Sequence, residues 1–356
     1  MKRLLLAAIL ILFLSIAVIG AEKEARIFRF RYSVEVKGKE DGKLIRIWIP
    51  LPQSSPYQEV KESKLILKGQ EEILLEELSP GSKIQIGDLS LSIHKEPVYS
   101  NLYAYGEIKS HKGETYLLVF EAVIHRKKVN SLQHPQTSSQ KLTQEELEKF
   151  LKANKKVPVG HPKIISHIRE ALDLKNKKEP ISISKKVSPK EALKKARRIY
   201  DYIYDQLKYD KSGFGWGRGD ALWACDNKRG NCTDFHSLFI SMMRTLKIPA
   251  RFEIGFPLPS QKKSGKIKGY HCWGWFYIKG IGWIPVDISE ADKHPEKKEF
   301  FFGGLDPHRV AFSTGRDLKL KPAPQNSPIN FFIYPIVEMD GKAYPFKREF
   351  SFYDLN

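Results

Sequence analysis

The chain is poor in cysteine and in acidic residues, and each shortage limits the kinds of protein that it can be. Three cysteines in 356 residues are too few for a small domain that depends on disulfides. Asp and Glu number 41 against 60 Lys and Arg, so the formal net charge is +19. This charge favours anionic partners such as a cell envelope. Cys/His finger spacing, aromatic RNA-binding motifs and recognition-helix pairs are all absent, so we expect no nucleic-acid partner.

Long hydrophobic runs are also missing, except at the start of the chain. The first residues, "MKRLLLAAILILFLSIAVIGA", carry two basic residues, an uncharged run from Leu4 to Ile19, and small residues at Gly20 and Ala21. This order is typical of a secretory signal peptide, here residues 1–21. The run falls short of the roughly 20 apolar residues that span a bilayer. We therefore expect an exported protein, periplasmic or extracellular, with an uncleaved N-terminal membrane anchor as the alternative.

Export to an oxidising compartment raises the question of how the cysteines pair. Cys225, Cys232 and Cys272 are an odd number. One arrangement joins Cys225 to Cys272 in a disulfide and leaves Cys232 free. The other leaves three buried thiols, and the sequence does not decide between them.

Hydrophobic periodicity divides the rest of the chain into three parts. Residues 22–135 contain alternating strand-like runs, beginning with "FRFRYSVEV", and predict a β-rich, sandwich-like domain. Residues 140–325 contain amphipathic helical segments such as "SPKEALKKARRIYDYIYDQL", in which Ser188 is the expected N-cap. Residues 326–356 read as C-terminal strands packed on the core. The whole predicts an α+β fold, with helices packed on an antiparallel sheet.

A cysteine stands at the expected start of a buried helix. Asn231 is a favoured N-cap residue, and Asp234 has the spacing to bond back to its backbone N–H. An apolar helical stripe then runs as far as Leu246, which makes Cys232 the first helical residue. Unpaired N–H groups and the helix dipole stabilise a thiolate there. The alternative interpretation is a cysteine that merely packs in the core.

A candidate base and a candidate orienting carboxylate follow downstream. "HCWGWFYIKGIGWIPVD" predicts two strands, with His271 on the first and Asp287 on the second, between the apolar residues Val286 and Ile288. A carboxylate among apolar residues is costly unless it accepts hydrogen bonds, which a histidine N–H supplies. An odd loop, such as residues 279–281, or a β-bulge is required to bring both side chains to one face of the hairpin.

Together these segments resemble the transglutaminase-like superfamily, whose thiol chemistry is related to that of papain. "GNCTDFHSLFISMMRTLKIPARFEIGF" matches the family's Gly-x-Cys-x-Asp and Ile-Pro-Ala-Arg elements, and the second segment matches its His-x-Trp and Gly-Trp-x-x-x-Asp strands. The resemblance extends more weakly over residues 190–340, toward predicted bacterial members. It implies that Cys232 is the nucleophile, His271 the general base and acid, and Asp287 the residue that orients the imidazole.

The implied reaction is acyl transfer on peptide or glutamine-type amides through a Cys232 thioester. The oxyanion donor is open. Candidates for this role or for substrate contact are Trp223, Trp216, Asn227 and Trp273. Acidic calcium-binding loops are not evident, so we expect neither a metal nor another cofactor.

Several alternatives stay open beside this one. Hydrolysis by an envelope cysteine peptidase or amidase cannot be separated from amine transfer, because water access to the thioester decides between them. A non-catalytic envelope protein could use the same fold for binding. A zinc site is a third interpretation, because His236 lies one helical turn after Cys232 and could join His271 and Asp287.

Overall fold

The computed structural model describes residues 24–67, 71–74, 80–135, 142–174 and 188–355. The predicted signal peptide, residues 1–21, lies outside these ranges. Within them, no helix combines the length and apolarity needed to cross a membrane.

The N-terminal residues build most of a β-sandwich, as predicted. Its two six-stranded sheets have the orders β13-β20-β1-β8-β3-β4 and β19-β18-β2-β7-β6-β5. Alternate residues of β1 and β2 point into the common core, and the Tyr32 hydroxyl donates to the carbonyl of Pro50 at 2.8 Å. The N-terminal strands are β1 (Ala25–Lys37), β2 (Leu44–Pro50), β3 (Gln58–Leu67), β4 (Glu71–Leu74), β5 (Lys83–Ile86), β6 (Leu89–Lys95), β7 (Leu102–Lys109), β8 (Thr115–Lys127) and β9 (Val129–Asn130).

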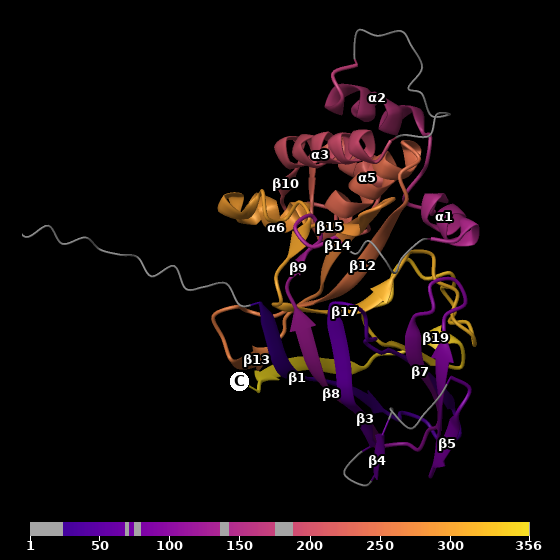
Figure 1. The fold of residues 1–356 in the computed structure, drawn as a ribbon. Coiled ribbons are helices and arrows are strands. Elements are labelled where there is room, and N and C mark those ends of the chain that lie inside the picture. The colour runs from indigo at the N-terminus through magenta and orange to yellow at the C-terminus, as the bar shows by residue number, and fades with distance from the viewer. Residues whose placement is uncertain (1–23, 68–70, 75–79, 136–141, 175–187, 356) are drawn as a thin grey trace, which may run out of the picture.

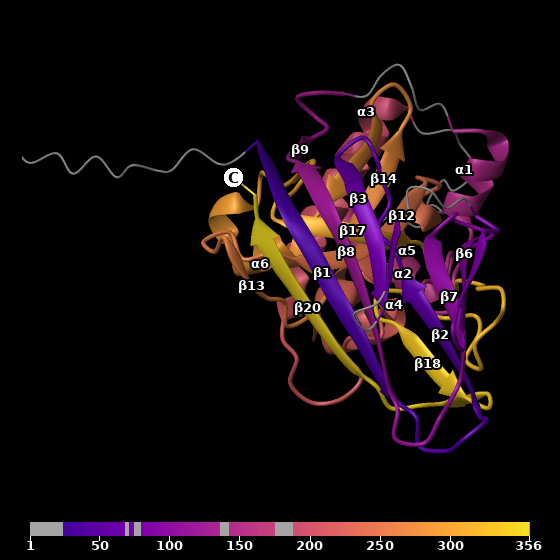
Figure 2. The same ribbon diagram turned by 90° about the horizontal axis from the view of Figure 1, so that it is seen from below.

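The end of the chain completes these same two sheets. Residues 326–356, expected as strands on the catalytic core, supply β18 (Ile336–Met339), β19 (Lys342–Ala343) and β20 (Lys347–Asp354). β20 pairs antiparallel with β1, and β18 pairs with β2. Figure 2 shows β20 beside β1 and β18 beside β2. Apolar side chains such as Phe350 and Phe352 thereby enter the sandwich core.

The middle of the chain folds into helices around one antiparallel sheet, which confirms the predicted α+β class. The sheet order is β15-β14-β12-β17, and helix α5 packs against β14 and β12. The helices lie above the sandwich in Figure 1. The elements are α1 (Gln144–Leu151), α2 (Pro162–Ala171), α3 (Pro189–Gln206), β10 (Lys208–Tyr209), α4 (Ala221–Asn227), β11 (Arg229–Gly230), α5 (Cys232–Thr245), β12 (Ala250–Pro257), β13 (Ser264–Lys266), β14 (His271–Ile278), β15 (Gly282–Val286), α6 (Ile288–Lys293), a 3-10 turn (Pro295–Lys297), β16 (Gly304–Leu305) and β17 (Arg309–Thr314).

Helix starts follow the capping signals in the sequence. Thr143 and Glu146 form a full capping box at α1, and the Ser188 side chain accepts from the backbone N–H of Glu191 at α3. A capped first turn satisfies N–H groups that have no partner inside the helix. The predicted N-cap Ser188 is thus confirmed.

The sandwich also covers one face of the four-stranded sheet β15-β14-β12-β17. Trp273, Trp275 and Trp283 are buried in a cluster with Val129 of β9, and the Tyr57 ring stacks on Trp275 with centroids 5.8 Å apart. The opposite face of β14 packs on α5. The four-stranded sheet is therefore packed between a helical layer and the sandwich.

Candidate active site

Helix α5 begins as the sequence predicts and places Cys232 at its first position. The Asn231 side chain accepts from the N–H of Thr233 at 2.9 Å, and Asp234 accepts from the N–H of Asn231 at 3.0 Å. Every residue of the helix is buried, including Cys232 at 1% exposure. Asp234 also accepts from the backbone N–H groups of Gly217 and Gly219. It thus ties the glycine-rich segment to the start of the helix, the structural role expected of it.

The hairpin of β14 and β15 has the odd loop that the prediction required. Ile278 pairs with Gly282 and Gly274 with Val286, which leaves three loop residues. With this register His271 and Asp287 meet, and their Nε2 and Oδ2 atoms are 2.7 Å apart. Asp287 lies just beyond β15, where it caps α6 by accepting from the N–H of Glu290. The structure therefore brings the two predicted partners together, with the carboxylate at a helix start instead of inside a strand.

Cys232 and His271 form a charged pair. Burial alone would raise the pKa of Cys232, but hydrogen bonds from Cys272 and His271 and the nearby imidazolium bring that pKa well below its ordinary value. Burial alone would lower the pKa of His271, whereas Asp287 and the Cys232 thiolate raise it to about 10. Both shifts favour the ion pair, in which the sulfur is a thiolate and the ring an imidazolium. Because Nε2 bonds Asp287, Nδ1 is the nitrogen left for the sulfur.

A buried arginine and a second carboxylate extend this network, and the sequence reasoning missed both. Arg309 donates to Asp287 at 2.8 Å through Nη1 and to Asp306 at 2.8 Å through Nη2. Burial acts to raise the pKa of Asp287, yet the charges of His271 and Arg309 hold it far below its usual range. Arg309 is 2% exposed and Asp287 is fully buried, so the carboxylate is held from two sides by buried cations. The sequence feature that could have indicated Arg309 is its place as the first residue of the apolar run "RVAFST".

His236 is placed by backbone groups and not by a metal. Its Nδ1 lies 2.8 Å from the carbonyl of Cys232, and its Nε2 accepts from the N–H of Ile288 at 3.1 Å. Burial lowers its pKa to about 4, so the ring is neutral with the proton on Nδ1. Both ring nitrogens are therefore occupied. In the described part of the chain, no group of three or more metal-ligating side chains has the geometry to hold a metal ion.

The candidate oxyanion donors are mostly engaged elsewhere. The Trp216 indole donates to the Gly213 carbonyl at 3.1 Å, the Trp273 indole to Glu253 at 2.5 Å, and the Asn227 amide to the Trp223 carbonyl at 2.9 Å. The Trp223 ring lies against Gly215.

A candidate donor that the sequence reasoning missed lies near Cys232. The Tyr270 hydroxyl accepts from the Asn231 amide at 3.0 Å and also hydrogen-bonds Thr233. Burial, and then the charge of the Cys232 thiolate, raise the pKa of Tyr270, so it stays protonated beside the sulfur. Its position directly before His271 was the available signal.

The three cysteines are free, so the possible Cys225–Cys272 disulfide is not formed. The physical reason is position. Cys225 lies on α4, whereas Cys272 faces α5 from β14, with its sulfur 3.7 Å from Nδ1 of His236. Cys272 is also the thiol that hydrogen-bonds the Cys232 sulfur. It therefore belongs to the surroundings of the nucleophile.

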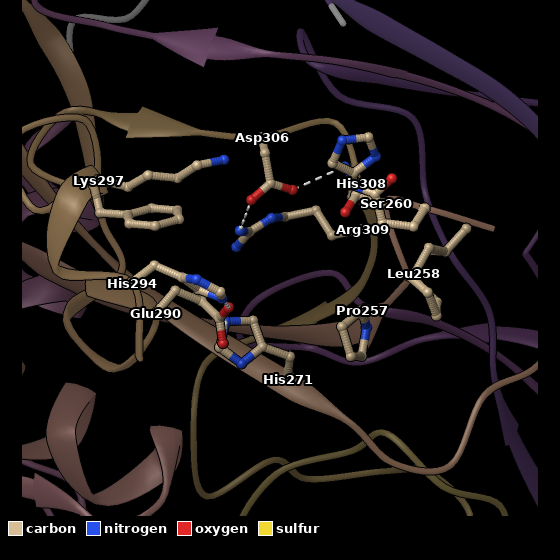
Figure 3. A pocket seen from close by; sticks show the side chains of 13 residues that line it. Pro257, Leu258, Ser260, His271, Glu290, His294, Lys297, Asp306, His308 and Arg309 are labelled. Atoms are coloured by element: carbon tan, nitrogen blue, oxygen red, sulfur yellow. Dashed lines mark hydrogen bonds and ion pairs between the residues drawn. The ribbon is translucent and has the colours of Figure 1, made fainter. Parts of the chain in front are cut away.

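A polar cavity of about 480 Å³ opens on the imidazole side of the pair. One wall is the segment from Pro257 to Gln261, and the others come from the ends of α6 and from the loop before β17. Figure 3 shows His294 and Glu290 next to His271, facing Asp306 and Arg309 across the cavity. The segments "HPEKK" and "DPHRV", for which the sequence suggested no role, thus line the space beside the candidate base.

Comparisons with known proteins agree with this geometry. Residues 181–288 match the model of the transglutaminase-like superfamily. An uncharacterized protein of Haemophilus influenzae is 33% identical over 181 residues, which are 42% of this chain and 49% of that protein. The chain thus spans about half the length of this curated relative.

Among solved structures, a candidate cysteine protease of Cytophaga hutchinsonii aligns over 94% of this chain and 92% of its own, with a TM-score of 0.52 and 15% identity. The periplasmic domain of TgpA from Pseudomonas aeruginosa aligns over 78% of this chain and 99% of its own, with a TM-score of 0.34 and 12% identity. The first likeness supports the fold across most of the chain.

Proposed function

Because the chain carries a transglutaminase-like domain over residues 181–288, we propose that it is an exported thiol acyl-transfer enzyme. Its substrates are peptide or glutamine-type amides, and Cys232 is its nucleophile. The observation that carries the proposal is the buried chain of hydrogen bonds from Cys232 through His271 to Asp287. A thiolate with an imidazolium beside it and a carboxylate behind it has the components of nucleophilic acyl transfer. Export is supported by the signal-like N-terminus.

The proposed reaction begins when the Cys232 thiolate attacks the amide carbon. The carbonyl oxygen becomes an oxyanion, which the Cys232 backbone N–H and the Tyr270 hydroxyl stabilise; the former has no acceptor inside the helix. The carbon–nitrogen bond then breaks, and the imidazolium of His271 gives its Nδ1 proton to the leaving amine. A thioester and a neutral imidazole remain. Asp287 keeps the ring oriented throughout, and Arg309 keeps Asp287 ionised.

The second half returns the enzyme to its starting state. His271, now neutral, takes a proton from water or from an acceptor amine as that nucleophile attacks the thioester carbon. The carbon–sulfur bond breaks, which restores the thiolate and the imidazolium. The cavity borders His271 and not Cys232. It is therefore suited to the amine half of the amide, the half that receives the proton.

Trapping the thioester tests the proposal. Short incubation with an activated ester, such as a nitrophenyl ester of a blocked glutamine, should add one acyl group to Cys232, located by peptide mass spectrometry. Excess amine should release the group as an amide if the enzyme transfers, and as the free acid if it hydrolyses. The matched control is Cys225→Ala, which removes another buried cysteine and should acylate normally. Absence of the adduct at Cys232, with label elsewhere, would refute the proposal.

A further inference from the structure

A buried arginine from the first strand of the sandwich holds one wall of the cavity. We propose that Arg26 is a positioning residue that sets this wall and so governs which amine halves the enzyme accepts. The inference rests on the proposed function, since it concerns the substrate of the same site. The cavity wall that Arg26 contacts is formed by the segment 258–263, which joins β12 to β13.

Arg26 has four hydrogen-bonding partners, although it belongs to a strand of the sandwich. Its guanidinium donates to the carbonyls of Pro259 at 3.1 Å and Lys262 at 2.6 Å. Its Nη1 also lies 3.1 Å from Nδ1 of His308, which lines the same cavity. Its Nε donates to Asp354 at 2.8 Å, near the end of the chain. The Arg26 side chain is 2% exposed, and its bond to Asp354 is buried.

The segment 258–263 is also fixed by the C-terminal strand. The backbone N–H of Asp354 donates to the carbonyl of Lys263 at 2.6 Å, and β13 pairs with β20 from Ser264 onward. The N–H of Leu258 donates to the carbonyl of His308 at 2.8 Å. Arg26 is therefore the side chain that joins the middle of the segment to strands from both ends of the sequence.

The same segment forms the wall facing the catalytic imidazole. Pro257, Leu258, Pro259, Ser260 and Gln261 line the cavity together with His271. Buried charge-assisted hydrogen bonds to two carbonyls restrict the backbone of such a loop, which is otherwise free to adopt many conformations. The wall keeps one shape when the substrate arrives, so binding does not have to order it. A substrate with a peptide-like amine half contacts this wall, whereas a primary carboxamide, which releases ammonia, does not reach it.

The test compares two amides that share one acyl half. One is a primary carboxamide, and the other continues as a peptide beyond the scissile bond. We expect Arg26→Gln to raise KM for the extended amide about 10-fold, a loss of about 1.4 kcal/mol of binding. KM for the primary amide, kcat for both and the alkylation rate of Cys232 should stay within about twofold. Arg26→Lys should restore part of the loss, because it keeps the charge and one donor.

Two further variants separate position from folding. Arg31→Gln removes an exposed arginine of the same strand, whose ion pair with Glu121 is 4.0 Å long, and should change neither KM. Ser260→Trp fills the cavity from an exposed loop position, so it should reduce turnover of the extended amide alone. This variant tests the role of the cavity wall independently of whether Arg26→Gln folds. Equal effects on both amides, or no effect on either, would overturn the inference. A wild-type protein that turns over neither amide would overturn the proposed function and this inference with it.

Discussion

Replacing Cys232 by alanine is expected to lower kcat/KM by about 10⁴-fold or more, because the thiol that forms the thioester is removed. The fold should survive, since the lost sulfur is small and the helix cap is made by Asn231 and Asp234. Steady-state kinetics on an amide substrate, together with circular dichroism, measure both effects. Cys225→Ala is the control, because Cys225 is buried on α4, away from the pair. Turnover of Cys232→Ala within about tenfold of wild type would show that catalysis does not use this thiol.

Replacing Asp287 by alanine should damage both activity and stability. Its carboxylate bonds His271 and Arg309 in a fully buried position, so its removal takes the carboxylate partner from His271 and one of two carboxylate partners from Arg309. Breaking a buried ion pair from one side costs about 3–5 kcal/mol. We also expect kcat to fall by about 10²–10⁴-fold, because the imidazole loses its orientation. Denaturant unfolding and steady-state kinetics measure the two effects.

An exposed acidic residue provides the matched control for that experiment. Asp340 pairs with Lys43 at 2.9 Å, and both side chains are more than 40% exposed. Surface pairs of this kind contribute about 0–1 kcal/mol, so Asp340→Ala should be close to wild type in stability and activity. Asp287→Ala with unchanged stability would mean that Arg309 and His271 do not depend on this carboxylate.

Local signals allowed the sequence to predict the parts of the site that are close in the chain. The capping box at α5 needs residues three apart, and the meeting of His271 with Asp287 depends on the parity of one short loop. Each is decided by backbone geometry within a few residues, namely a helical turn or a strand pleat. The prediction that Cys232 lies beside His271 rested instead on the resemblance of two separate segments to the transglutaminase-like superfamily.

Contacts between distant strands could not be predicted in this way. Arg309 reaches Asp287 because β17 pairs with β12, and Arg26 reaches the cavity because β20 joins β1 to the end of the chain. Neither pairing leaves a periodic signal, since alternation in a strand reveals its buried face but not its neighbour. The oxyanion candidates show a related limit. An indole or amide N–H is available only when no local carbonyl or carboxylate accepts it, and that depends on side-chain packing.

The account depends on a thiolate–imidazolium pair at Cys232 and His271, and the pH dependence of Cys232 alkylation tests it most directly. Iodoacetamide labelling of the wild type, quantified by peptide mass spectrometry from about pH 5 to 9, should already be fast at about pH 6 and should not climb around the ordinary thiol pKa, because the pKa of Cys232 lies well below that value. Acyl transfer, in contrast, should decline as the pH rises through about 10, where His271 loses its proton. In His271→Ala the thiolate loses its cation, so labelling at about pH 6 should slow at least tenfold and then rise with pH. A wild-type labelling rate that climbs around the ordinary thiol pKa of about 8.5, and is unchanged by His271→Ala, would contradict the account.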